Sequence, residues 1–258
     1  MRTLFEAVLP LIPFVLLVSV RVGVMLASLP APFGSGAPPQ IRVALGLFIT
    51  IALCTPHFAD PPIIPLEPVT LAVAGLGELM VGAVIGLTVR VMLAAAEVAG
   101  NVAGMSMGQG FAASIDPAFG EKMLPLGRLL SALMVLIFLS LNGHHVTFAS
   151  LAWSLDALPV GNALGHAVHG DTVSIGADLM ARGLRIASPI LAAMFIVQLG
   201  MGLIARSAPR VQIFSLTFAI TSAVGAVVLF AALPSVTGAL VETLGRLPLD
   251  LQNALGGR

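Results

Sequence analysis

The chain has 258 residues, of which 58% are hydrophobic and 9% charged, and its mean hydropathy is +1.05. Soluble domains carry roughly a quarter charged residues, so this chain lacks the charge density that a water-facing surface needs. Its twelve basic and twelve acidic residues cancel, which argues against the basic field on which nucleic-acid binding depends. These values predict one all-α integral membrane domain over residues 1–258, surrounded by membrane lipid and without a nucleic-acid partner.

Six apolar segments predict about six membrane helices arranged in hairpins, at residues 4–29, 41–55, 69–96, 123–153, 186–204 and 211–233. The first segment imitates a signal peptide, because Arg2 precedes an apolar stretch. Glu6 and Arg21 interrupt that stretch and apolarity continues to Leu29, so we expect a retained helix. The second segment is short for a span, and Pro56 stops it. The connections rich in Pro, Gly or polar residues are 30–39, 56–68 and 154–178.

Basic residues indicate the orientation, because they fall at alternate helix ends, at Arg42, at Lys122 with Arg128, and at Arg206 with Arg210. The turns that carry them should face the cytoplasm. The tightest of these turns is RSAPR, which predicts a cytoplasmic hairpin tip formed by Arg206, Pro209 and Arg210. Arg182 and Arg185 lie at the outer end of the fifth segment and oppose this orientation.

Residues 97–122 resemble neither an ordinary spanning helix nor an ordinary loop. Glycines recur there every four residues, at Gly100, Gly104 and Gly108. On a helix they form one smooth face, which predicts a close helix neighbour. Beyond Gly108 the helix should fail, because Gly110 lowers helix propensity and Asp116 with Pro117 favours a turn. We therefore expect an irregular loop over residues 108–120, which would line an interior cavity if it lies at membrane depth.

Met105, Met107 and Phe111 flank this loop and could form a deformable apolar gasket, since thioethers adapt to varied shapes. The alternative interpretation is that these three side chains fill an ordinary core, which is the more frequent role of apolar stripes.

Charged residues also occur in the third apolar segment, at Glu78 and Arg90, and just after it, at Glu97. Arg90 and Glu97 are seven residues apart and so share one helix face. We predict an intramembrane charge pair between Arg90 and Glu97. The alternative is that both side chains extend toward the membrane surface.

The sequence gives little support for catalysis or for a cofactor. The single cysteine, Cys54, can form no internal disulfide, and the histidines at 144, 145, 166 and 169 lack a convincing ligand spacing, so we predict no metal site. Nucleotide-binding, serine-hydrolase and zinc-protease motifs are absent from the sequence. We predict neither an enzyme nor a cofactor.

Several sequence stretches, in order along nearly the whole chain, resemble the FliR family of bacterial protein-export components. The most specific is GQGFAASIDP at residues 108–117. The others are QIRVALGLFIT at 40–50, RLLSALMVLIFLSLNGHH at 128–145, LDALPVG at 155–161 and LIARSAPRVQIFSLTFAI at 203–220.

The resemblance implies a subunit of the flagellar type III export gate in the bacterial inner membrane, within the flagellar basal body. Its partners would be FliP, FliQ and FlhB, and unfolded flagellar proteins would pass through the gate they form. The family's hairpins assemble helically with partner subunits, which implies a FliP-like portion at residues 1–180 and a FliQ-like hairpin at 181–258. The implied inner plug comprises Gly108, Gln109, Gly110, Phe111, Asp116 and Pro117. Relatives often carry a second aromatic residue where this chain has Ser114.

Three alternatives remain open at this point. The chain could be the equivalent subunit of a virulence type III secretion system, since both systems share the gate architecture. It could be a small-solute transporter with broken helices, although that would require internal repeats and a polar midplane site. An intramembrane enzyme using His144 or His145 is the third.

Overall fold

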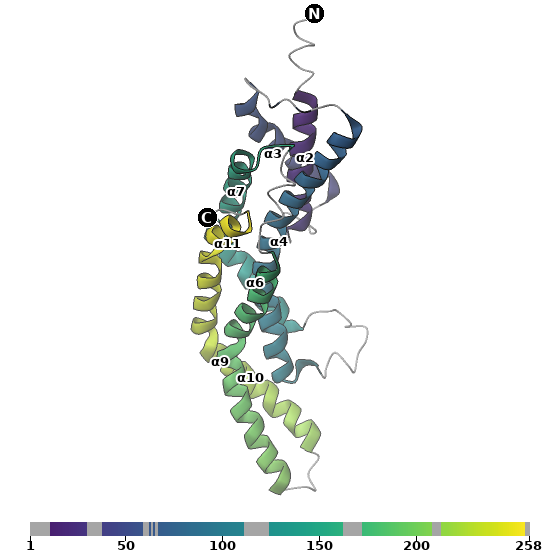
Figure 1. Cartoon of the computed structure of the whole chain (residues 1–258). Helices are drawn as coiled ribbons and strands as arrows, with labels where there is room; N and C mark the ends of the chain where they lie inside the picture. Colours follow the sequence, from purple (N-terminus) through teal and green to yellow (C-terminus); the bar gives the residue numbers. More distant parts are fainter. Residues whose placement is uncertain are drawn as a thin grey trace, which may run out of the picture. The chain divides into compact units, whose positions relative to one another are not determined.

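The structure is a computed structural model, and it describes residues 11–29, 38–58, 62, 64, 67–110, 124–161, 172–207 and 213–255. Every regular element in these ranges is a helix (Figure 1). The elements are α2 (Leu11–Ser28), α3 (Pro39–Cys54), the short 3₁₀ helix η1 (Thr55–His57), α4 (Pro68–Ser106), α6 (Pro125–Ser140), α7 (Gly143–Ala157), α9 (Thr172–Ser207), α10 (Ile213–Gly245) and α11 (Leu247–Ala254).

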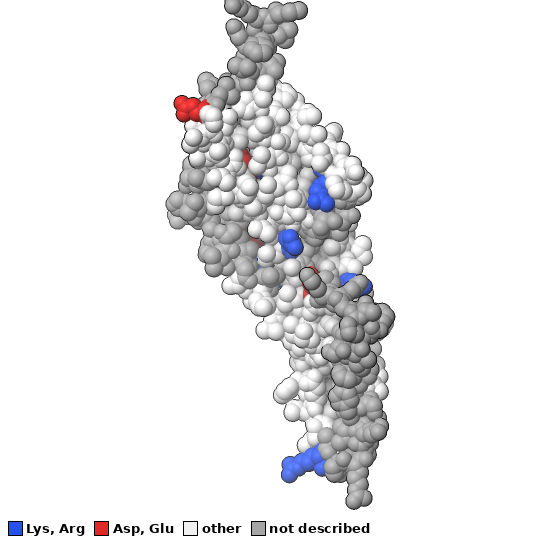
Figure 2. Space-filling view, turned by 90° about the vertical axis from the view of Figure 1, so that its right-hand side faces the viewer, with Lys and Arg blue, Asp and Glu red and all other residues white. Residues whose placement is uncertain are grey.

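Within the described residues, five helical segments are long and apolar enough to cross a membrane, and α6 with α7 makes a sixth if the two form one span. Large apolar side chains such as Phe48, Ile196 and Phe230 are exposed on them. On the described part of the face in Figure 2, charged residues are few and widely separated. An apolar exterior of this kind suits lipid or partner helices. The prediction of an all-α membrane protein with about six apolar helices is therefore confirmed.

The predicted fourth helix, residues 123–153, is wrong in one respect, because it is divided into α6 and α7. Leu141 and Asn142 form a turn between them, and Asn142 has a φ of 55°. Asparagine tolerates this left-handed conformation, and Asn followed by Gly is a strong turn signal. The local turn chemistry of Asn142-Gly143 outweighs the continuous apolarity that suggested one helix.

Three other helices extend beyond their predicted limits. Helix α4 continues from Ala96 to Ser106, and α10 continues past Leu233, with Pro234 inside it, to Gly245. Helix α9 begins at Thr172, within residues 154–178 that were predicted as a polar connection. Hydropathy underestimates such ends, because small and charged residues also form helix. In α9, Arg182 donates to Asp178 one turn earlier, at 3.3 Å.

The chain packs into two compact units. The first comprises residues 1–91, 143–175 and 247–258, and the second comprises residues 92–142 and 176–246. Helix α4 contributes its residues up to Val91 to the first unit and the rest to the second. The two units are defined only by how the chain packs on itself, which does not test likeness to another protein. The predicted likeness of residues 1–180 to FliP and of residues 181–258 to FliQ therefore stays a prediction.

Each unit is built around helical stripes of apolar residues. In the first unit, α2 buries one face that carries Phe14, Leu17, Val18, Val22 and Met25. In the second unit, α6 buries Leu126, Leu130, Met134 and Phe138, every four residues. By contrast, α3 buries only Thr50 and Cys54, so almost all of its apolar surface remains available to lipid or to another molecule.

Candidate functional site

Gly100 lies on the buried face of α4 in the second unit, where the backbone of α6 approaches it closely. A Cβ atom on Gly100 would lie 2.5 Å from Gly127 Cα and 2.6 Å from the Leu126 carbonyl oxygen. Real side chains do not tolerate such distances, so only glycine fits here. A Cβ atom on Gly104, one turn later, would lie 2.8 Å from Gln109 Oε1. The predicted close neighbour of this glycine face is therefore α6 at Gly100 and the Gln109 side chain at Gly104.

Two side chains from the α4 region cap the start of α6. The N-cap residue of α6, Leu124, makes no side-chain cap of its own. Its backbone N–H donates to Asn101 Oδ1 at 2.9 Å, and the Leu126 N–H donates to Gln109 Oε1 at 3.2 Å. Helix starts leave such N–H groups without intrahelical partners. These bonds thus fasten together the two places where the chain leaves α4 and enters α6.

We predict that the double change Asn101→Ala and Gln109→Ala loosens this fastening. Loss of a cap costs about 1 kcal/mol, so the pair should lower the free energy of unfolding by about 2 kcal/mol if the two effects add. Thermal unfolding of the purified protein in detergent measures the change. Thr237→Ala, which removes a hydroxyl bonded only within α10, is the control and should leave stability almost unchanged. Equal stability of the double variant and the wild type would show that the caps do not hold this junction.

The end of α4 turns sharply at Met107 and Gly108. The Gly108 N–H donates to the Met105 carbonyl at 3.0 Å, and Gly108 has a φ of 83°, which glycine adopts without strain. The predicted end of the helix near Gly108 therefore matches the structure, in which α4 ends at Ser106.

Residues from α9 and α10 hold this turn in the second unit. Gln198 Nε2 donates to the Ser106 carbonyl at 2.9 Å, and Ser222 Oγ donates to the Met107 carbonyl at 3.5 Å. Met107 is 3% exposed and lies against Gly225, where an added Cβ would come within 2.7 Å of its Cγ. Together with the Asn101 bond to the start of α6, these bonds join the end of α4 to α6, α9 and α10.

The two methionines predicted as a gasket have different surroundings. Met107 is buried, whereas Met105 is 67% exposed. Gly108 and Gly110 are half-buried. The other predicted plug residues, Phe111, Asp116 and Pro117, lie outside the described residues, so their predicted role stays a prediction.

The remaining predicted site residues are placed only in part. Arg90 is exposed in the first unit and Glu97 is half-buried in the second, so a charge pair between them stays a prediction. Arg206 is exposed near the end of α9, while Pro209 and Arg210 lie outside the described residues. Among the described residues, no group of three or more His, Cys, Asp or Glu is placed to hold a metal.

An ion pair between Arg21 and Glu78 is buried in the first unit. Both side chains are 0% exposed, and Arg21 Nε donates to Glu78 Oε2 at 2.5 Å. Arg21 also donates from Nη1 to the Ser154 carbonyl at 2.8 Å and to Ser154 Oγ at 3.0 Å, and from Nη2 to the Leu158 carbonyl at 3.0 Å. Glu78 Oε1 accepts from the Gly161 N–H at 3.1 Å. The pair therefore joins α2, α4, the end of α7 and the turn after it.

The backbones of α2 and α4 also lie close together beside this ion pair. Gly82 follows Glu78 by one helical turn, and a Cβ atom there would overlap the Arg21 carbonyl oxygen. Helices α2 and α4 are thus in contact at Gly82, next to the ion pair. Buried charges are tolerated when they are paired and hydrogen-bonded, and each nitrogen of the Arg21 guanidinium and each carboxylate oxygen of Glu78 has a partner.

Sequence reasoning missed this network. Arg21 was interpreted as a residue that interrupts the first apolar segment, and Glu78 was considered only beside charges of its own helix. The available signal was the rule that an ionisable residue within an apolar span needs a specific partner. That rule indicates that a partner exists, but not which distant residue it is.

These features define a class of protein, a multi-pass helical membrane protein whose buried polar groups, among the described residues, join neighbouring helices. Residues 12–247 match the family described as bacterial export proteins, family 1. The chain is 29% identical to the flagellar biosynthetic protein FliR of Escherichia coli, over 83% of this chain and 82% of that one. It is 31% identical to FliR of Pectobacterium carotovorum, over 76% and 74% of the two chains. It is also 29% identical to the Yop proteins translocation protein T of Yersinia pestis, over 71% and 72%.

The chain therefore belongs to the bacterial export proteins of family 1, and the predicted resemblance to the FliR family is confirmed. It is a multi-pass protein of the bacterial inner membrane and a subunit of a type III protein-export gate.

Proposed function

We propose that this subunit completes, with FliP and FliQ and next to FlhB, the channel through which unfolded flagellar proteins cross the inner membrane. One observation supports this role above the others. Residues at the end of α4 and at the start of α6 are bonded to each other, so the two ends of the stretch that joins these helices are held together. The stretch that starts there, GQGFAASIDP, is also the most specific resemblance to the family.

Within this proposal the two methionines have separate tasks. Met107, buried and bonded through its carbonyl to Ser222, anchors the base of the plug. Met105, which is exposed, seals against neighbouring subunits or the passing chain, and its flexible thioether suits a surface of changing shape. Phe111 is the constriction residue, and it keeps the closed pore dry by excluding water.

The subunit is a passive conduit in this proposal and supplies no catalytic step. It carries no nucleotide-binding motif, and the buried carboxylate of Glu78 is occupied by Arg21 and Gly161. Such a carboxylate is not arranged as a member of a proton relay. The energy for export therefore enters through a partner subunit.

Phe111→Ala is expected to open the resting channel to small membrane-impermeant solutes. Removing the aromatic ring leaves the constriction wider and wetter, so leakage should rise severalfold while the complex still assembles. The measurement is uptake of a membrane-impermeant fluorescent dye by cells that produce the gate. Phe48→Ala, which removes an exposed phenylalanine from α3, is the matched control and should not leak. Closed channels in the Phe111 variant would remove this residue from the seal.

A second candidate is the equivalent subunit of a virulence secretion system, which the likeness to the Yop translocation protein T favours. Restoration of swimming to a bacterium that lacks its own FliR would support the flagellar role. Restoration only of virulence-protein secretion, in a strain that lacks the translocation protein T, would support the second role instead.

A further inference from the structure

In the first unit, α4 has an exposed apolar face that no described element covers. A helix that is apolar on nearly all sides, as α4 is, is covered by protein or by lipid. Ala83 is half-buried and the other residues of the face are exposed. The face ends at Arg90, and its apolar members are Val69, Val73, Leu76, Met80, Ala83 and Leu87. These residues together with Arg90 form the α4 seam.

The spacing of the α4 seam is that of a helix–helix contact. Its members follow one another at intervals of four, three, four, three, four and three residues, which is a seven-residue repeat kept from Val69 to Arg90. Two helices that wind around each other bring such positions into contact, because the repeat averages about 3.5 residues per turn. A surface that faces lipid needs apolarity but no fixed repeat. The spacing therefore favours a helix as the molecule that covers the seam.

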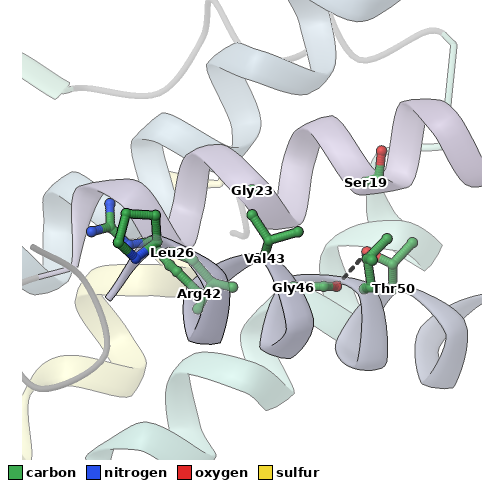
Figure 3. A pocket seen from close by; sticks show the side chains of 9 residues that line it. Ser19, Gly23, Leu26, Arg42, Val43, Gly46 and Thr50 are labelled. Carbon is green, nitrogen blue, oxygen red and sulfur yellow. Dashed lines mark hydrogen bonds between the residues drawn. The ribbon is translucent and has the colours of Figure 1, made fainter. Parts of the chain in front are cut away.

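The other sides of α4 are already packed within the first unit. A Cβ atom on Gly86 would lie 2.8 Å from the Met25 carbonyl oxygen of α2, and Ile85 and Val89 are buried. Helix α3 lies against α2, and the pocket between these two helices, shown in Figure 3, is lined by residues of α2 and α3. The α4 seam is thus separate from the contacts that hold the first unit together.

The α4 seam carries one charged residue, Arg90. Within the described residues of the first unit, its guanidinium makes no hydrogen bond or ion pair, and Glu78 is occupied by Arg21. Arg90 belongs to a candidate membrane span, and ionisable residues in such spans pair with opposite charges. Glu97 is two turns away, about 10 Å along the helix axis, whereas a residue on a helix packed against the seam would lie directly opposite Arg90.

We propose that the α4 seam binds an apolar helix of a partner subunit, and that this helix places an Asp or Glu side chain against Arg90. The apolar members of the seam supply close packing. The ion pair fixes the register, because a shift by one turn would leave both charges in apolar surroundings without a counter-charge. The inference rests on the proposed function in one respect, namely that the chain works within an assembly, and it uses no residue of the plug.

Photo-cross-linking tests whether a helix lies on the seam. Leu76 or Leu87 is replaced by the photoreactive residue p-benzoylphenylalanine in cells that produce the complete export machinery, and the adducts are identified by mass spectrometry. We expect both positions to be joined to one helix of one partner subunit, at sites about eleven residues apart. Leu249, which is exposed on α11, is the matched control and should not be joined to that helix. Adducts only with lipid, with a second copy or with this chain itself would overturn the inference.

Arg90→Glu tests the charge. Two carboxylates that face each other across a contact repel, so recovery of the cross-linked partner with the tagged chain should fall about tenfold or more. Arg90→Lys keeps the charge and should retain most of the binding. Arg246→Glu, on an exposed surface of α10, is the control and should recover the partner as the wild type does. Thermal unfolding of the purified chain should be unchanged in Arg90→Glu, because the side chain has no bond within the first unit.

A second charge reversal completes the test. The acidic residue of the partner that lies opposite Arg90 in the cross-linked register, when changed to arginine, should restore recovery with Arg90→Glu. Restoration by Glu97→Arg would instead show that Arg90 pairs within its own helix, and would overturn the inference. Recovery that is unchanged in Arg90→Glu contradicts the inference alone, whereas a wild-type chain that recovers no partner at all contradicts the proposed function as well.

Discussion

Replacing Glu78 with alanine is expected to destabilise the protein by about 3–5 kcal/mol, the usual cost of removing one member of a buried ion pair. The variant leaves the Arg21 guanidinium buried without its counter-charge and the Gly161 N–H without its acceptor. Both groups then bear a desolvation cost with nothing to offset it. Because the pair joins α2, α4 and the end of α7, the whole first unit should loosen.

The measurement is thermal unfolding in detergent, together with the amount of chain that accumulates in the membrane. Glu242→Ala is the matched control, because Glu242 accepts from Arg246 at 3.0 Å on an exposed helix surface. Exposed pairs one turn apart contribute only about 0.3–0.5 kcal/mol, so this variant should behave almost as the wild type. A Glu78 variant as stable as Glu242→Ala would contradict the assigned role of the buried network.

Replacing Gly100 with valine is expected to separate α4 from α6 and to abolish export. The new Cβ would overlap the backbone at Gly127 and Leu126, which cannot move aside as a flexible side chain can. Overpacking usually costs about 1–3 kcal/mol, and here it also displaces the Asn101 and Gln109 caps at the base of the proposed plug. We therefore expect export to be abolished, although the free energy of unfolding falls by only about 1–3 kcal/mol.

Secretion of a reporter fused to an export substrate measures the functional loss, and unfolding in detergent measures the stability. Gly238→Val on α10 is the control, because a Cβ there meets nothing within 4 Å. Valine and glycine differ little in helix propensity compared with such a clash, so the control should secrete normally. Normal secretion by the Gly100 variant would show that close packing of α4 on α6 is not required.

Much of the fold could be predicted from the sequence because hydropathy and turn chemistry act locally. The apolar runs located the helices, and the glycines around residue 108 correctly placed the end of α4. The same reasoning failed at Asn142, where two residues interrupt a continuous apolar run, and at Thr172, where a less apolar segment is nevertheless helical. Both errors arise because average apolarity is a weaker guide than the local backbone preference of individual residues.

The Arg21–Glu78 pair could not be predicted from local sequence patterns. The two residues are 57 positions apart, and their other partners, Ser154 and Gly161, lie farther along the chain. Spacing on a single helix favoured Arg90 with Glu97, because residues seven apart share a face. Pairing across helices depends on which helices become neighbours, and helical periodicity carries no information on that choice.

The measurement that tests the proposed gate most directly is the composition of the complex. The tagged full chain is extracted from native membranes in mild detergent, and the proteins that remain bound are quantified by mass spectrometry. We predict recovery of FliP and FliQ, both in excess over this chain. Recovery of the chain as an isolated monomer or homodimer would contradict the gate proposal and favour a transporter that works without partners.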